Sequence, residues 1–532
     1  MRSWKPSRGE LLFLSAAALI WLAILCWLPP NMGGTDDYMF RDPACNFAAG
    51  LGFRSASVDH AHSFQPMLYS HYTPLSLWLF IPVAKFFGCT AVSNQVFGLL
   101  WAALIDIVVV VVGLRFLIKA SHRWLFLFLA AVLLPYGVVP REDRPEPVSF
   151  CILVALAILL RRRPTVATSL AAGLLGAAAF LSEPFAGVVA FFLIAGWMLA
   201  TLFESSAERR VPFGKLAALS LLAAVCYAAP VTITAVSFYK IDHQSLQRFM
   251  YQAVNTGVSR DTSYTMGEGK NWNAAKVDQS SRLGKIEDGL RFRRILGPVR
   301  EYELAIDGLV VLTWIGLVLL SRGDAKARLF LALAGLFCCV LPFVVFPMQG
   351  HYLMLGCALL PVLLGLNWAF TREALRTTAA IPVLLAIAML SPLPAVALNT
   401  ISLAESRAAY RYAFTQTATL RDYLQQHPLA HPVVLVPTSH YFLYKDIAHN
   451  IYNPTFLSYR YQDPDQIGAV VNCYTGVKDF APGTLPLPPF VAAEKWQEIS
   501  VSRDPVAVTL FHRKIMSRNW SPECDLYVRA NP

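Results

Sequence analysis

The sequence predicts a polytopic α-helical membrane protein, and two features of the chain carry this prediction. First, 56% of its 532 residues are hydrophobic, only 15% are charged, and the mean hydropathy is +0.48. A soluble domain carries about 25% charged residues. A chain this apolar cannot hide its surface in a water-soluble core, so lipid must be its solvent. Second, its apolar residues form runs that approach the length of about 20 residues needed to cross a bilayer.

About eleven runs qualify as membrane helices. They cover residues 11–28, 96–118, 124–139, 148–160, 166–181, 185–203, 216–238, 304–320, 329–346, 352–370 and 379–398. The first run follows Arg2, Lys5 and Arg8 and could be a signal peptide. It exceeds the usual apolar core of about 7–15 residues and lacks a small-residue cleavage site, so we interpret it as an uncleaved helix.

The charge distribution sets the expected topology. The net charge is +11, but Lys and Arg occur in short clusters between apolar runs, which is typical of membrane surfaces and not of a nucleic-acid-binding patch. Residues 72–87 are an ambiguous segment, because they are apolar but contain Pro74, Pro82 and Lys85. If this segment does not span, every basic cluster falls on the cytoplasmic side, as the positive-inside rule requires. We therefore expect it to lie along the outer face, with the N-terminus inside.

The same topology places three large pieces on the outer side. They are a first loop (29–95), a second long loop (239–303) and a C-terminal domain (401–532), whereas residues 1–400 form the transmembrane domain. The C-terminal domain is expected to be a small α/β unit, with a helix at 402–426 and strands at 433–437, 469–474, 507–511 and 526–528. Cys473 and Cys524 in this domain form a disulfide or stay free thiols, and the sequence leaves both open.

The first outer loop opens with an acidic pair, Asp36-Asp37, just past the first predicted helix. One interpretation is a solvated loop start. The other is a general base or metal ligand that faces a substrate at the level of the lipid headgroups.

The residues that follow the pair extend the pattern. The chain continues Tyr38-Met39-Phe40-Arg41-Asp42-Pro43-Ala44, then Gly50-Leu51-Gly52-Phe53, His71-Tyr72-Thr73-Pro74-Leu75 and Lys85-Phe86-Phe87-Gly88. This order resembles the GT-C superfamily of membrane glycosyltransferases, especially the protein O-mannosyltransferases and the lipid A aminoarabinose transferases. Those families carry an acidic pair (usually Asp-Glu), a helix ending in a glycine turn, a Pro-Pro-Leu-like segment and a Lys-hydrophobic-Phe-Gly segment.

Two departures from that pattern affect the expected roles. The pair here is Asp-Asp, and Thr-Pro stands where the families have Pro-Pro. The match makes Asp36 the expected base, and the departure at Asp37 leaves open which carboxylate acts. The resemblance also implies a helix after the pair and an outer-face position for residues 72–87.

A second acidic cluster lies between the third and fourth predicted helices. It comprises Glu142, Asp143 and Glu146, with Arg141 and Arg144 among them. It could be a self-neutralising interfacial loop. The resemblance instead implies a second acidic motif that lines the same outer cavity as Asp36. Glu183, before Pro184, is a further outer-facing carboxylate that either lines this cavity or simply occupies a turn.

A polyprenyl-phosphate donor would also need cations near its phosphate. The outer-facing candidates for phosphate binding are Lys85, Arg141, Arg144, the basic stretch Arg291-Arg293-Arg294 and the His351-Tyr352 pair, and the resemblance favours Lys85. His and Tyr at an interface are otherwise ordinary membrane anchors. Asp59, His60, His62 and His71 share the first loop but show no zinc spacing. We expect no metal and no other cofactor, with a divalent cation as the remaining alternative.

Together these features predict a glycosyltransferase of the cell inner membrane. It would move a sugar from a polyprenyl-phosphate donor to an envelope lipid, glycan or protein, with inversion, on the outer face. Alternatives from other classes are a multi-pass transporter or lipid flippase and a non-catalytic envelope-assembly scaffold. A transporter predicts internal repeats and interrupted helices in matching halves, and the sequence shows no repeat.

Overall fold

The computed structural model describes two parts of the chain, a helical part within residues 6–241 and a β-rich part within residues 418–529. The described segments are residues 6–27, 35–55, 67–68, 74–117, 119–138, 146–160, 162–202, 211–241, 315, 418, 421–429, 431, 433–437, 442, 450–452, 467–473, 496–500, 509–510, 513–514 and 524–529. For some helix residues, Asp36, Asp37 and Glu146 among them, the description covers the backbone only.

Seven of the predicted membrane helices fall in the helical part, and all seven are confirmed as helices. They are α1 (Arg8–Trp27), α4 (Ala91–Phe116), α5 (Ala120–Val138), α6 (Glu146–Leu159), α7 (Val166–Ser182), α8 (Pro184–Leu202) and α9 (Phe213–Ile241). The four runs predicted beyond residue 303 and the loop at 239–303 lie almost entirely outside the described residues. Two more helices, α2 (Thr35–Ala48) and α3 (Leu75–Phe87), lie between α1 and α4, with a short β1–β2 pair (Arg54–Ser55 and Met67–Leu68) between them.

The outward faces of these helices are apolar. Large side chains such as Leu12 on α1, Leu100 on α4 and Leu221 on α9 are more than half exposed. Among the described residues, one helical stretch, Phe213–Ser237, is long and apolar enough to cross a membrane, and four shorter apolar helices accompany it. With the overall composition, these faces are those of a helical membrane protein whose outer surface contacts lipid.

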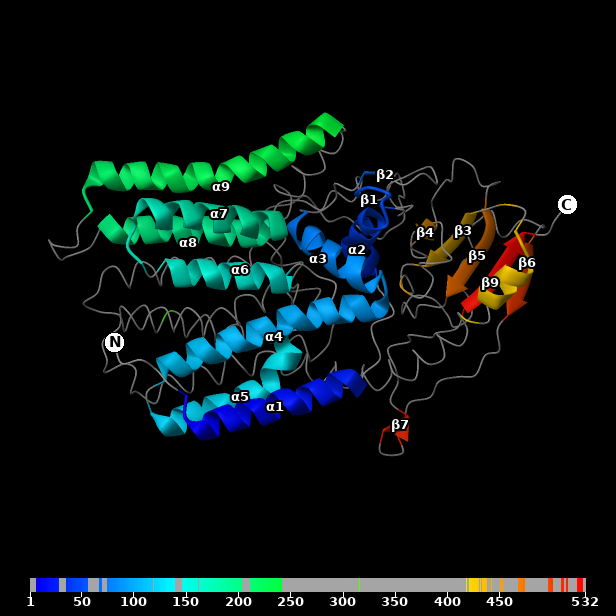
Figure 1. Cartoon of the computed structure of the whole chain (residues 1–532), viewed down its shortest axis with the longest axis horizontal. Helices are drawn as coiled ribbons and strands as arrows, with labels where there is room; N and C mark the ends of the chain where they lie inside the picture. The colour runs from blue at the N-terminus through cyan, green and yellow to red at the C-terminus, as the bar shows by residue number, and fades with distance from the viewer. Residues whose placement is uncertain are drawn as a thin grey trace, which may run out of the picture.

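The helices alternate in direction, and contacts between their ends show this. At the start of α1, Glu10 forms an ion pair with Arg123 at the start of α5 (2.6 Å), so these two starts lie at one end of the bundle. Gly113, near the end of α4, lies against Phe126 in the first half of α5. Helix α4 therefore runs opposite to α1, and α2 and α3 lie together at the far end (Figure 1). We call that end of the bundle the α2 end.

The connectors of the bundle differ in charge between its two ends. The described basic connectors lie at the end opposite α2 and α3; they carry Arg8, Lys119, Arg123, Arg162, Arg163 and Lys215. The Trp197 indole donates a hydrogen bond to the Arg162 carbonyl oxygen (3.0 Å), which joins the end of α8 to the connector after α6. The acidic starts of α2 and α6 belong to the α2 end (Figure 1). This sorting matches the expected path in which α2 and α3 do not cross between α1 and α4.

Helices α7 and α9 are the most closely packed pair among the helices that the structure describes. A Cβ built on Gly173 would meet the backbone carbonyl of Ala223 and would lie 2.6 Å from Cys226 Cβ. A Cβ on Gly176 would lie 2.5 Å from the Tyr227 ring. Glycine at position 173 therefore lets the two backbones approach this closely, and glycine at position 176 leaves room for the Tyr227 side chain.

The β-rich part is a five-stranded mixed sheet of order β4-β3-β5-β9-β6. Its strands are β3 (Val433–Pro437), β4 (Asn450–Tyr452), β5 (Ile467–Cys473), β6 (Trp496–Ser500) and β9 (Cys524–Arg529). Strand β3 pairs in parallel with β4 and β5, whereas β9 is antiparallel to β5 and β6. The sheet lies beyond the α2 end of the bundle (Figure 1). The predicted strand at 507–511 instead forms β7 (Thr509–Leu510), which pairs only with β8 (Arg513–Lys514).

Candidate functional site

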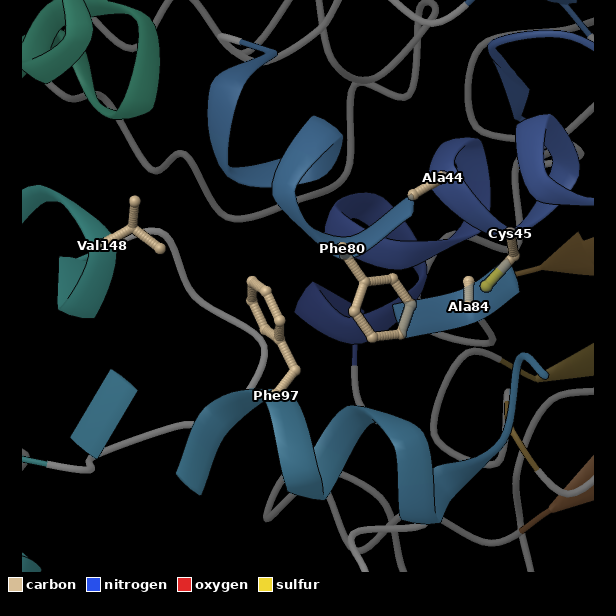
Figure 2. Packing of buried hydrophobic residues seen from close by; sticks show 6 residues of the cluster. All are labelled: Ala44, Cys45, Phe80, Ala84, Phe97 and Val148. Atoms are coloured by element: carbon tan, nitrogen blue, oxygen red, sulfur yellow. The ribbon is translucent and has the colours of Figure 1, made fainter. Parts of the chain in front are cut away.

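A buried cluster joins four helices at the α2 end, and we call it the α2 cluster. It consists of Ala44, Cys45, Phe80, Ala84, Phe97 and Val148. These residues come from α2, α3, α4 and α6, and Figure 2 shows the rings of Phe80 and Phe97 turned toward each other. The two rings meet edge to face with centroids 5.3 Å apart. The cluster therefore fixes α2 and the start of α6 to the same point of the bundle.

Arg41 of α2 enters the bundle beside this cluster. Its side chain is 1% exposed, and its guanidinium lies 4.9 Å from the Phe80 ring centroid and 4.8 Å from that of Phe97. Its Nε donates a hydrogen bond to Asn94 Oδ1 (2.6 Å). A desolvated cation between two aromatic faces is strongly attracted to both. Arg41 thus links α2 to α3 through Phe80 and to α4 through Phe97 and Asn94.

A disulfide adds a covalent link at the same place. Cys45 in α2 is bonded to Cys89, which lies in the turn between α3 and α4, with Cα atoms 5.6 Å apart. That turn begins at Gly88, whose φ of 74° is accessible to glycine at little cost. The spacing of the cysteines along the chain does not predict this pair. The one available signal was that both cysteines fall in the predicted first outer loop, where an oxidising environment permits disulfides.

The predicted acidic pair lies at the N-terminal end of α2, the helix that Arg41 and Cys45 anchor. Asp36 and Asp37 lie in the first turn of α2, whose residues from Arg41 to Asn46 are buried. The N-terminal end of a helix stabilises carboxylates in their ionised form by about 0.3–1 kcal/mol. A position at the start of a helix therefore favours the charged form of a carboxylate, which is the form that can accept a proton.

Glu146, the last residue of the second predicted acidic motif, lies at the same end of the bundle. Glu146 is the first residue of α6, two positions before Val148 of the α2 cluster. Ser149 in the same turn donates a hydrogen bond to Ser182 Oγ at the end of α7 (3.0 Å). Glu183 follows directly, is 5% exposed, and lies between α7 and α8. The backbones that carry Asp36-Asp37, Glu146 and Glu183 therefore all lie at the α2 end.

Lys85 occupies a different part of the site from Asp36. It is exposed in the last turn of α3, next to Ala84, which packs near Cys45 (Figure 2). Asp36 precedes Cys45 by nine residues of α2, which is about 13 Å along the helix axis. The structure thus puts Lys85 level with the buried half of α2 and the acidic pair at the other end of that helix.

The remaining predicted site residues lie outside the described residues. They are Arg141, Glu142, Asp143, Arg144, Arg291, Arg293, Arg294, His351 and Tyr352, together with Asp59, His60, His62 and His71 of the first loop. In the described part of the chain, no group of three or more His, Cys, Asp or Glu side chains is arranged to hold a metal ion. The expectation about metal stays a prediction.

Comparison with known proteins gives two similar solved structures. No family model matches the chain, and no curated protein matches it. An oligosaccharyltransferase from Archaeoglobus fulgidus, tethered to an acceptor peptide, is 14% identical with a TM-score of 0.48, covering 89% of this chain and 70% of that one. ArnT from Cupriavidus metallidurans, bound to undecaprenyl phosphate, is 12% identical with a TM-score of 0.38, covering 98% of this chain and 99% of that one.

The likenesses are distant in sequence and loose in geometry. Roles for the residues of this chain therefore follow from its own side chains and backbone.

Proposed function

We propose that this protein is a membrane glycosyltransferase that uses a polyprenyl-phosphate-linked sugar on the outer face of the inner membrane. One observation carries the proposal. The helix that bears Asp36 and Asp37 and the helix that begins at Glu146 rest on one buried cluster, at the end of the bundle opposite the basic connectors. By the positive-inside rule the basic end is cytoplasmic, so the acidic segments gather on the outer side.

The reaction is a direct displacement at the anomeric carbon. Asp36, or Asp37 in its place, takes the proton from an acceptor hydroxyl or amine as that group attacks the sugar. The new bond joins the acceptor to the anomeric carbon, and the bond from that carbon to the donor phosphate oxygen breaks. The electron pair leaves with the lipid phosphate, which Lys85 and an arginine stabilise. A single displacement inverts the anomeric centre.

The anchoring of α2 supports this role for the acidic pair. A catalytic base must be held close to its working position, because misplacement by about 1 Å costs on the order of 10²-fold in rate. The Arg41 contacts and the Cys45–Cys89 bond hold the middle and the end of α2 on two neighbouring helices. The first turn then projects from a fixed support. The prenyl chain of the donor is accommodated by lipid and by the apolar helix faces.

The test replaces each aspartate by asparagine, which keeps the shape and removes the base. General-base assistance contributes about 10²–10⁴-fold, so Asp36→Asn should lower transfer by at least that lower value. Transfer is measured by mass spectrometry of envelope lipids, glycans and proteins from cells with the gene, without it, and with each variant. A matched control is Asp422→Asn, which removes a carboxylate from the β-rich part.

Two results would count against the proposal. Unchanged glycosylation in both Asp36→Asn and Asp37→Asn would exclude both aspartates as the general base. No difference between cells with and without the gene, across all three classes of envelope molecule, would favour the transporter or scaffold alternatives.

A further inference from the structure

The register of the C-terminal sheet brings together two cysteines whose state the sequence leaves open. Strand β5 pairs with β9 in antiparallel fashion, and Cys473 and Cys524 are the last matched pair of that ladder. The preceding pairs, Val471 with Leu526 and Ala469 with Val528, lie two and four residues back along β5. Because side chains alternate along a strand, the two cysteines occupy the same face as these pairs, directly across from each other.

The backbone geometry of this position fits a disulfide. Residues directly opposite in an antiparallel pair have Cα atoms about 4.5 or 5.5 Å apart, depending on whether the pair is hydrogen-bonded. Disulfides join Cα atoms that are roughly 4.4–6.8 Å apart. Both kinds of pair therefore meet the Cα distance requirement, and the non-hydrogen-bonded kind, whose Cβ atoms are about 4.5 Å apart, also comes within the Cβ separation of roughly 3.5–4.5 Å that a disulfide needs.

The location of the sheet supplies the chemical environment. The Cys45–Cys89 disulfide lies at the α2 end of the bundle, so that end faces a compartment that oxidises thiols. The sheet lies beyond the same end (Figure 1). Two cysteines at opposite positions of one strand ladder, in a compartment that oxidises thiols, are candidates for a disulfide.

We propose that Cys473 and Cys524 form a second disulfide of this protein, which ties the end of β5 to the start of β9. The two thiols lose two protons and two electrons as the S–S bond forms. The oxidant is a disulfide-bearing oxidoreductase of the outer compartment, whose own disulfide is reduced to two thiols by thiol–disulfide exchange. The bond closes a segment of 51 positions (524 − 473 = 51), and this segment contains β6, the other neighbour of β9.

This bond would join strands β5 and β9 covalently. Strand β9 lies between β5 and β6 and joins the parallel half of the sheet to its antiparallel edge. A covalent link would add to the ladder that pairs the end of β5 with the start of β9. The proposal concerns the sheet alone and stands or falls independently of the proposed sugar transfer.

The test is peptide mapping of the full-length protein without reductant. Free thiols are blocked with N-ethylmaleimide in intact cells, and the purified protein is digested with trypsin. Cleavage after Arg460, Lys478, Arg518 and Arg529 yields peptides 461–478 and 519–529, each with one cysteine. We expect one linked species that lacks two hydrogens relative to the sum of the two peptides, and its conversion to both peptides on reduction.

The controls use the other cysteines of the chain. Peptide 42–54 carries Cys45 and reports that the preparation is oxidised, and Cys151 of α6 is a free thiol. In the Cys473→Ser variant, Cys524 should become labelled, whereas Cys151→Ser should leave the linked species intact. Maleimide on both Cys473 and Cys524 of the wild type while Cys45 is protected would overturn the proposal, as would linkage of either to another cysteine.

Discussion

Replacing Arg41 by methionine should weaken the hold of the bundle on α2. The change keeps most of the volume and removes the charge, the hydrogen bond to Asn94 and the two ring contacts. Each buried cation–π contact is worth about 2 kcal/mol, and a hydrogen bond from a charged donor about 1.5–3 kcal/mol. The gross loss is therefore about 5.5–7 kcal/mol. Solvation of the arginine in the unfolded chain offsets several kcal/mol of this, which leaves a net destabilisation of about 2–3 kcal/mol.

Thermal unfolding of the purified protein in detergent measures this effect. For a cooperative unit of about 150–250 residues, each kcal/mol lowers Tm by about 2–4 °C, so Arg41→Met should lower Tm on the order of 5–10 °C. Arg163→Met is the matched control, because Arg163 is exposed at the opposite end of the bundle and its loss should leave Tm within about 1 °C. Arg41→Lys keeps the charge, so its Tm should lie between those of Arg41→Met and Arg163→Met.

The result that refutes this reasoning is equal Tm for Arg41→Met and Arg163→Met. In that case the buried guanidinium would contribute nothing net, and packing alone would hold α2. A second readout separates stability from function. At a temperature where both variants are folded, Arg41→Met should still transfer sugar more slowly than Arg163→Met, because the support of the acidic pair is looser.

Three further changes probe other contacts. Replacing Cys45 and Cys89 by serine opens a link across 44 positions, and the chain-entropy relation gives a loss of about 4 kcal/mol, visible as a lower Tm than that of the oxidised wild type. Gly173→Ala should destabilise by about 1–3 kcal/mol because its Cβ meets the α9 backbone. Gly214→Ala, with nothing within 4 Å, should leave Tm unchanged, and equal effects of both substitutions would contradict the packing. Lys85→Ala should raise the KM for the lipid-linked donor more than it lowers kcat, and an unchanged KM would exclude Lys85 from donor binding.

The long apolar helices could be predicted from the sequence, whereas the short polar helix α2 could not. Helices such as α4 and α7 are predicted by the length of their apolar runs. The structure adds their caps and, for α4, the residues from Ala91 to Gln95. Thr90 and Thr165 accept hydrogen bonds from the backbone three residues on and begin these two helices. Helix α2 has no apolar run and contains Pro43, so only the family resemblance implied it. Its formation depends on burying one face against α3 and α4.

The strands of the sheet could also be predicted from the sequence only in part. The strands 433–437 and 467–473 are β-branched and apolar, and composition alone indicates them. Strand β6, with the sequence WQEIS, is largely polar because it lies at an edge of the sheet, and no run marked it. The pairing of Cys473 with Cys524, and the bond between Cys45 and Cys89, depend on which strands and helices become neighbours. Cysteine spacing along the chain does not contain that information.

The most direct test of the account is the side of the membrane on which the two acidic helix starts lie. Single cysteines are placed at positions 37, 146 and 163 in a background without other reactive thiols, and intact cells are treated with a membrane-impermeant maleimide. The account predicts labelling at 37 and 146 in intact cells and at 163 only after permeabilisation. Labelling of 37 and 146 from opposite sides would contradict it, because the two carboxylate-bearing segments could not then share one outer site.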